Sequence, residues 1–151
     1  MPFPLPEPMR IALDQAREAA ALGEVPVGAV VTRGDSVLAV GRNRMRLGAD
    51  PTAHAEMIAL REAAHVLGTS RLDGCFLWVT LEPCAMCAGA IALARIERLY
   101  FGAGDPKGGA VLHGPRLFGQ PTCHHAPEIY PGIGEERSAA LLRDFFRKRR
   151  G

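Results

Sequence analysis

The sequence lacks any long hydrophobic run and any large excess of charge of one sign. No stretch reaches the ~18 apolar residues that a membrane-spanning helix needs, and residues 1–6 lack the basic start and apolar core of a signal peptide. We therefore expect a cytoplasmic protein with no membrane segment. The formal net charge is only +2. Any attraction to nucleic acid must therefore come from a local cluster of cations.

Cysteine is also scarce, with only Cys75, Cys84, Cys87 and Cys123 among 151 residues. In a chain without a secretion signal, a Cys-x-x-Cys pair such as Cys84 and Cys87 favours metal or redox chemistry over a disulfide framework. The length and the 48% hydrophobic content suit one domain over residues 1–151 with one core.

Hydrophobic periodicity and the positions of Gly and Pro predict an alternation of strands and helices after an initial hairpin. Residues 1–7, with Pro at every second position, form an extended lead-in. The expected helices span residues 8–22, 54–67, 84–94 and 135–150, and the expected strands span residues 28–32, 36–40, 75–80 and 98–101. This order indicates an α/β fold in which helices cover both faces of a mixed sheet.

Residues 102–134 are crowded with Gly and Pro. Connections of this length without regular structure are uncommon unless they are functional. We therefore expect a surface loop here that touches the substrate or a partner.

His54, Glu56, Cys84 and Cys87 carry the strongest chemical signal. Cys84 and Cys87 are three residues apart at the start of an expected helix, so their sulfur atoms project from one face, and His54 begins another helix. One nitrogen and two sulfur ligands suit a tetrahedral Zn²⁺ ion whose fourth position is open to water, as in a catalytic site. Zinc lowers the pKa of bound water from ~15.7 to about 7, and Glu56 could then accept and redistribute the proton.

Each half of this pattern has a simpler interpretation. A lone His-x-Glu is common on solvated helix faces, and a lone Cys-x-x-Cys could be a redox dithiol or half of a zinc ribbon. Cys123, His124 and His125 could in principle bind a second metal ion, but adjacent residues rarely converge on one ion without partners elsewhere. We therefore expect one zinc ion per chain.

Taken together, the motifs match the zinc deaminase signature His-x-Glu…Pro-Cys-x-x-Cys, and the sequence resembles the bacterial tRNA-specific adenosine deaminases. This branch of the cytidine deaminase-like superfamily converts the wobble adenosine of a tRNA anticodon to inosine. The tRNA branch is indicated by Asp-Pro-Lys-Gly-Gly at residues 105–109 and by the final Phe-Phe-Arg-x-x-Arg at residues 145–150. Together the matching segments span residues 24–30, 50–56, 79–90, 102–110 and 141–150.

The resemblance implies a three-layer α/β/α cytidine deaminase-like fold with a mixed five-stranded sheet, and a homodimer whose two subunits both shape each RNA site. It assigns zinc binding to His54, Cys84 and Cys87, and the general acid/base role to Glu56. Asn43 would orient the flipped nucleoside, and Asp105 would lie near the backbone of the target nucleotide. The expected substrate contacts are Asn43, Asp105, Lys107, His125, Phe146 and Arg150.

The chain departs from the common family pattern at residues 111–116 and 121–125. Many members have a Gly-Ser stretch in the first segment and an Asn-His pair in the second. The departure concerns RNA contacts in this loop and leaves the zinc chemistry unaffected. For His125 we expect a place in a loop near the RNA.

Two other functions remain open from sequence. A deaminase of free guanine, cytosine or cytidine would use the same zinc site, and a basic surface around the pocket would distinguish the RNA enzyme from it. A catalytically silent subunit with a structural zinc would only bind RNA. Glu56 argues against this second function, because a binding module does not need a carboxylate beside an open metal position.

Overall fold

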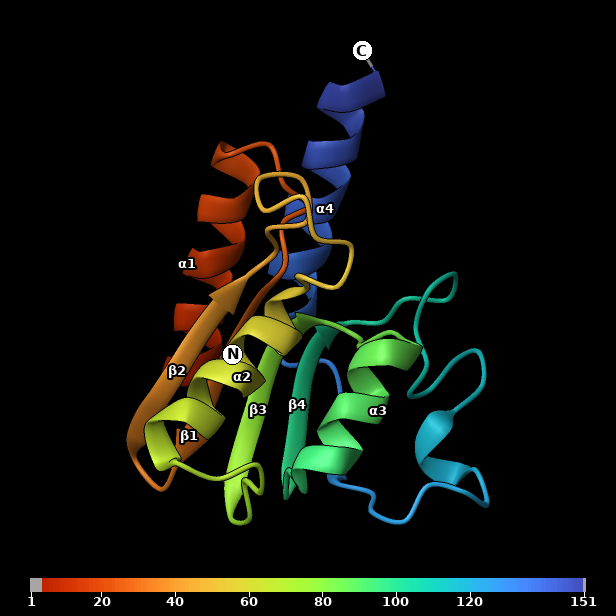
Figure 1. Ribbon diagram of the computed structural model, residues 1–151. Helices are drawn as coiled ribbons and strands as arrows, with labels where there is room; N and C mark the ends of the chain where they lie inside the picture. Colours follow the sequence, from red (N-terminus) through yellow and green to blue (C-terminus); the bar gives the residue numbers. More distant parts are fainter. Residues whose placement is uncertain (1–3, 151) are drawn as a thin grey trace.

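The structure, a computed structural model, describes residues 4–150 (Figure 1). Residues 1–3 of the expected lead-in lie outside the described residues. The chain order is α1 (Glu7–Ala21), β1 (Gly28–Arg33), β2 (Ser36–Arg42), α2 (Ala55–Leu67), β3 (Cys75–Leu81), α3 (Ala85–Ala94), β4 (Arg98–Ala103), a 3₁₀ turn (Leu117–Gly119), β5 (Glu128–Tyr130) and α4 (Glu135–Arg150).

The five strands form one mixed sheet in the order β2-β1-β3-β4-β5. The first three strands pair antiparallel, and β3, β4 and β5 pair parallel. Helices α2 and α3 cover one face, and α1 and α4 cover the other (Figure 1). The expected three-layer α/β/α architecture is therefore confirmed.

Alternation along β3 shows how the sequence builds both cores. Leu77 and Val79 face the cluster under α2 and α3, whereas Trp78 faces the cluster under α1 together with Met9 and Leu13. Successive side chains of a strand point to opposite faces. Because both faces of β3 are covered, its sequence is apolar from Cys75 to Val79. The sheet is thus a rigid base for the loops at its edge.

Two glycines let helices approach the sheet at backbone distance. A methyl group at Gly28 would lie 1.9 Å from the Ala12 carbonyl oxygen of α1, and one at Gly41 would lie 2.4 Å from the Ala55 carbonyl oxygen. No other residue fits at such separations. Gly41 therefore sets the distance between β2 and the first turn of α2, where the functional residues begin.

The prediction for residues 102–134 is wrong in part. The segment contains the 3₁₀ turn at Leu117–Gly119 and the fifth strand at Glu128–Tyr130. A three-residue strand is too short to show an alternating pattern, and β5 is held by its parallel pairing with β4. Among residues 4–150, no helix is both long and apolar enough to cross a membrane.

Candidate active site

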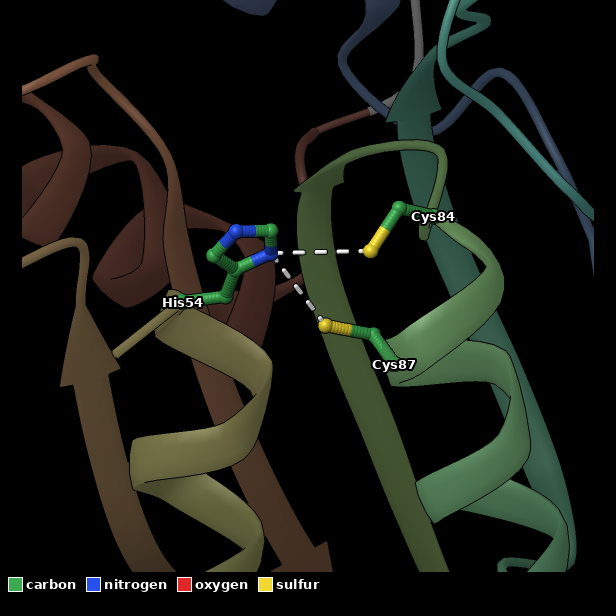
Figure 2. A group of neighbouring side chains, drawn as sticks. All are labelled: His54, Cys84 and Cys87. Carbon is green, nitrogen blue, oxygen red and sulfur yellow. Dashed lines mark hydrogen bonds between the residues drawn. The ribbon is translucent and has the colours of Figure 1, made fainter. Parts of the chain in front are cut away.

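The first turns of α2 and α3 meet beyond the end of β3. His54 and Cys84 are the residues immediately before the two helices, each with extended backbone angles, and Cys87 lies in the first turn of α3. All three side chains point into the space between the helices (Figure 2). The positive ends of two helix dipoles thus favour negative charge there.

The spacing of the three side chains fits a tetrahedral metal site. His54 Nδ1 lies 3.5 Å from both Cys84 Sγ and Cys87 Sγ, and all three atoms lie within 4.8 Å of one another. Zinc bonds of ordinary length in a tetrahedron place nitrogen and sulfur about 3.6 Å apart. In the described part of the chain, no fourth His, Cys, Asp or Glu joins this group. The donor set therefore fits zinc with one coordination position left open.

Without a cation, the two thiols share a proton unequally. The Cys87 thiol donates to Cys84, and this bond, together with one to His54, lowers the pKa of Cys84 to about 4 despite partial burial. The same bond and burial raise the pKa of Cys87. The hydrogen bond with Cys84 also raises the pKa of His54. A divalent cation bound in place of these protons would be compensated by two thiolates.

Glu56 lies in the first turn of α2 and is 4% exposed. Burial raises the pKa of its carboxyl group to about 7, and the Cys87 thiol is within hydrogen-bonding reach. A carboxyl group with a pKa near neutrality can both accept and release a proton. The structure thus brings Glu56 beside the three candidate ligands, and its catalytic role remains a prediction.

Asn43 connects the loop after β2 to the start of α2. It is 7% exposed, its Oδ1 accepts from the Ala55 N–H at 2.8 Å, and its Nδ2 donates to the Val25 carbonyl at 3.2 Å. Asn43 also lines a cavity of about 250 Å³ together with Phe146. The structure therefore brings together two expected substrate contacts that are about a hundred residues apart in sequence.

Asp105 and Lys107 lie in the loop after β4. The Asp105 Oδ1 atom accepts from the backbone N–H groups of Lys107 at 3.2 Å and Gly108 at 3.0 Å, which forms a tight turn. Asp105 is half-buried and Lys107 is exposed. Figure 1 shows this loop near the N-terminal end of α3, where Cys84 and Cys87 lie.

Two buried glutamates near the site were not predicted from the sequence as functional residues. Glu24 accepts from the backbone N–H groups of Arg46 and Leu47 at 3.2 and 2.7 Å, and Glu82 accepts from the loop that contains Asp105. Both residues are 2% exposed, and each carboxylate binds one loop at the edge of the site. A signal was present for Glu82, because it follows the apolar strand β3 directly and precedes the Pro83-Cys84 motif.

The C-terminal basic run is partly engaged within the protein. Arg149 donates to the Gly23 carbonyl and packs over the Phe145 ring at 4.7 Å, while Arg147 lies 3.9 Å from Asp144. Lys148 is exposed. Phe146 is 45% exposed, and the side chain of Arg150 lies outside the described residues. Arg149 thus ties α4 to the loop after α1, a role that sequence did not indicate.

His125 is not brought to the candidate site. Its Nε2 atom hydrogen-bonds the Ile96 carbonyl oxygen at 2.7 Å, which lies beyond the C-terminal end of α3, whereas the candidate ligands lie at the other end of this helix. The Cys123 thiol donates to the His125 carbonyl at 3.2 Å. Among residues 4–150, Cys123, His124 and His125 do not group as a metal site.

Comparison with known proteins identifies the family. The MafB19-like deaminase family matches residues 6–150. The tRNA-specific adenosine deaminase of Agrobacterium fabrum is 56% identical over 142 residues, which cover 94% of this chain and 93% of that protein.

Solved structures agree with this result. A structure from a study of A-to-I editing by tRNA deaminases at the wobble position superposes with a TM-score of 0.88 at 55% identity, over 89% of this chain and 98% of the other. A guanine deaminase from Nitrosomonas europaea has a TM-score of 0.74 at 27% identity, over 91% and 82% of the two chains. The chain therefore belongs to the MafB19-like deaminase family and, within it, to the tRNA-specific adenosine deaminases.

Proposed function

We propose that this protein hydrolyses the wobble adenosine of a tRNA anticodon to inosine, with release of ammonia. The observation that carries the chemistry is the convergence of one nitrogen and two sulfur donors beside the buried carboxyl group of Glu56. The choice of RNA over a free base is supported by the high identity to tRNA-specific adenosine deaminases over nearly the whole chain.

His54, Cys84 and Cys87 would hold one zinc ion through Nδ1 and two thiolate sulfur atoms. When bound, the metal would lower the pKa of a coordinated water to about 7 and supply a nucleophile at neutral pH. Because Nδ1 faces the sulfur atoms, the ring must carry its proton on Nε2 to act as a ligand. The chain thus supplies a ligand set of net charge −2.

Glu56 would carry the protons. Its carboxylate takes a proton from the attacking water and delivers it to N1 of the adenine as the C6–O bond forms, then passes the second water proton to the departing amine as the C6–N bond breaks. Burial of Glu56 suits this exchange because it brings the pKa close to neutrality. Water is consumed and ammonia released, with no other co-reactant.

The surroundings of the site would bind an extruded nucleotide. C6 of adenine is unreachable in a base stack, so the base must leave it, at a cost of a few kcal/mol. An anticodon loop lowers this cost because its bases are already partly splayed. Asn43 and Phe146 line one cavity, and Asp105 and Lys107 lie in the loop after β4, so the proposed contacts come from two sides.

We further propose that one deaminase domain extends over residues 1–151 and acts in the cytoplasm as a homodimer. An association between two chains is supported by α3, whose residues are all apolar, and by Leu93 on this helix, which is 82% exposed. A helix that is apolar all round is expected to be buried on every side. In the described monomer, one side of α3 is open.

Unmodified tRNA transcripts with adenosine at the wobble position test the proposal. Inosine should appear as an A-to-G change after reverse transcription, and transcripts with the adenosine moved to another anticodon position serve as the control. Free adenosine, guanine, cytosine and cytidine are assayed in parallel. Efficient turnover of any of these small molecules, without editing of the transcript, would establish the alternative function of a free-base or nucleoside deaminase.

A further inference from the structure

Glu82 occupies a central position between β3 and the candidate metal site. It follows the last residue of β3 and is separated from Cys84 only by Pro83. Its side chain has no exposed surface. One carboxylate oxygen, Oε1, accepts from the Asp105 backbone N–H at 2.9 Å and lies 2.7 Å from the His113 Nδ1 atom. An ionised carboxylate has no proton to donate, so the His113 ring donates this bond.

The second oxygen binds the far end of the same loop. Oε2 accepts from the backbone N–H groups of Val111 at 3.1 Å, Leu112 at 2.9 Å and His113 at 3.2 Å. Residues 104–116 contain no helix or strand, so their N–H groups need partners outside regular structure. Five charge-assisted bonds from one carboxylate satisfy that need for the two ends of the loop.

The loop also fits tightly around the carboxylate. A methyl group at Gly109 would lie 2.5 Å from Glu82 Cδ and Oε2, so the main chain passes the carboxylate at contact distance. The next residue, Ala110, donates its N–H to the Pro83 carbonyl at 2.9 Å. The middle of the loop is thereby joined to the residue that immediately precedes the candidate ligand Cys84.

Asp105 connects Glu82 to the exposed turn. Its backbone N–H is held by Glu82, and its own side chain holds the N–H groups of Lys107 and Gly108. The conformation of the turn therefore depends on the buried carboxylate beneath it. Without that anchor, Asp105 and Lys107 would sample many positions, and RNA binding would have to order them.

We propose that Glu82 is a positioning residue for the RNA substrate, because it fixes residues 105–113 at the edge of the metal site and so places Asp105 and Lys107. The inference rests on the proposed tRNA substrate, since a free base is too small to need this loop for its affinity. His113 is the one side chain that contributes to the anchor, and it lies where the sequence departs from the common family pattern.

Glu82→Gln is the direct test, because the amide keeps the size of the side chain and turns one of its two oxygens into a donor that faces N–H groups. We expect the Kd for an anticodon stem-loop RNA to rise roughly tenfold or more, which corresponds to ~1.4 kcal/mol. The amides of residues 105 and 111–113 should exchange faster with deuterium in the free protein. Bound zinc should remain at one ion per chain.

Gly109→Ala tests the same anchor from the loop side, and it should reproduce both effects with the carboxylate still present. His113→Ala removes one of five donors and should weaken binding by only about two- to fivefold. Thr32→Val is the control for general destabilisation, because it breaks a buried 3.0 Å hydrogen bond from Trp78 within the sheet. It should leave both RNA affinity and loop exchange unchanged.

The exchange measurement separates this inference from the proposed function, because it needs neither RNA nor turnover. Faster loop exchange with weaker RNA binding in Glu82→Gln and Gly109→Ala, but not in Thr32→Val, supports the inference. Unchanged exchange, unchanged Kd, or equal weakening in Thr32→Val overturns it. If Glu82→Gln fails to fold, Gly109→Ala and His113→Ala decide by the same criteria. Absence of editing by the parent protein would instead count against the proposed function.

Discussion

Glu56 and Glu82 are both buried, but their surroundings give their carboxyl groups opposite properties. Burial raises the pKa of Glu56 to about 7. For Glu82, burial is again the largest single effect and raises the pKa, but hydrogen bonds from Asp105, His113, Leu112 and Val111 together hold it below its ordinary value. A carboxyl group whose pKa lies near neutrality suits proton transfer, whereas one whose pKa is lowered stays ionised and suits the binding of N–H groups.

Glu56→Gln should therefore abolish turnover while leaving the fold and zinc content intact. The amide has nearly the same size but cannot accept and release protons, and general acid/base groups contribute typically ~10²–10⁴-fold to rate. The measurement is editing of a wobble-adenosine transcript under single-turnover conditions, with RNA affinity measured on the same preparation. Turnover within a few-fold of the parent at equal affinity would contradict the assigned role.

Zinc analysis tests the three candidate ligands. Protein purified without chelators should contain one zinc ion per chain, and Cys84→Ala combined with Cys87→Ala should contain none, because a single imidazole cannot hold the ion. Cys123→Ala is the matched control and should retain the metal, since Cys123 donates to a backbone carbonyl outside the site. Full zinc occupancy in the double variant would show that another site binds it.

At this scale, sequence could predict the residues whose chemistry is carried by their own side chains. His54, Glu56, Cys84 and Cys87 form a spaced pattern of unusual types, so the motif alone indicated a metal site. Glu82 carries no such pattern, because its partners are mostly backbone N–H groups that the fold brings from 23 to 31 residues away. Backbone N–H groups look the same in every sequence, so the sequence does not indicate which of them will bind a side chain.

Among the secondary structure elements, predictability followed length and periodicity. The expected helix at 8–22 corresponds to α1 at Glu7–Ala21, and the expected strand at 75–80 to β3 at Cys75–Leu81. His54 and Cys84 proved to be the residues just before α2 and α3. Strand β5 was not predicted from periodicity, because three residues at a sheet edge depend on their neighbour and not on their own pattern.

Helix α4 allows RNA binding and intramolecular anchoring to be separated. Arg149 holds the Gly23 carbonyl and the Phe145 ring, so truncation after Phe146 would remove an internal contact along with the cations. Arg147→Ala with Lys148→Ala leaves that contact in place. We expect weaker tRNA binding and a salt dependence of log K that is shallower by up to ~0.9 for each phosphate that the variant no longer neutralises.

The control for this prediction is Arg71→Ala with Arg33→Ala, which removes one exposed cation from the end of β1 and one from the loop before β3. If RNA binding depends on particular contacts with phosphates and not on the net charge of the protein, this control should leave the slope of log K against log[salt] unchanged. An unchanged slope in the α4 double variant would show that its two cations do not contact phosphate. Zinc content should match the parent protein in both variants.

On the scale of the whole molecule, one apolar region of the surface supports the proposed homodimer. Helix α3 runs from Ala85 to Ala94 with only apolar residues, and Leu93 projects outward, 82% exposed. Beside it lies a cavity of about 330 Å³ lined by Leu93, Leu117 and His124 among others. An exposed apolar surface beside a cavity is typical of an interface between two protein chains.

If the proposed homodimer forms through α3, Leu93→Glu should convert it to a monomer. A carboxylate at the centre of an apolar interface would be buried without a partner, a cost that association cannot offset. Light scattering should give twice the chain mass of 16.2 kDa for the parent and one chain for the variant, with zinc retained by both. Val37→Glu is the control. It places the same charge on an exposed residue of β2, at the opposite edge of the sheet from β5, and this variant should stay dimeric.

If both subunits shape each RNA site, the monomeric variant should also lose tRNA editing. A Leu93→Glu protein that is still dimeric would instead show that α3 faces solvent or RNA and not a second chain.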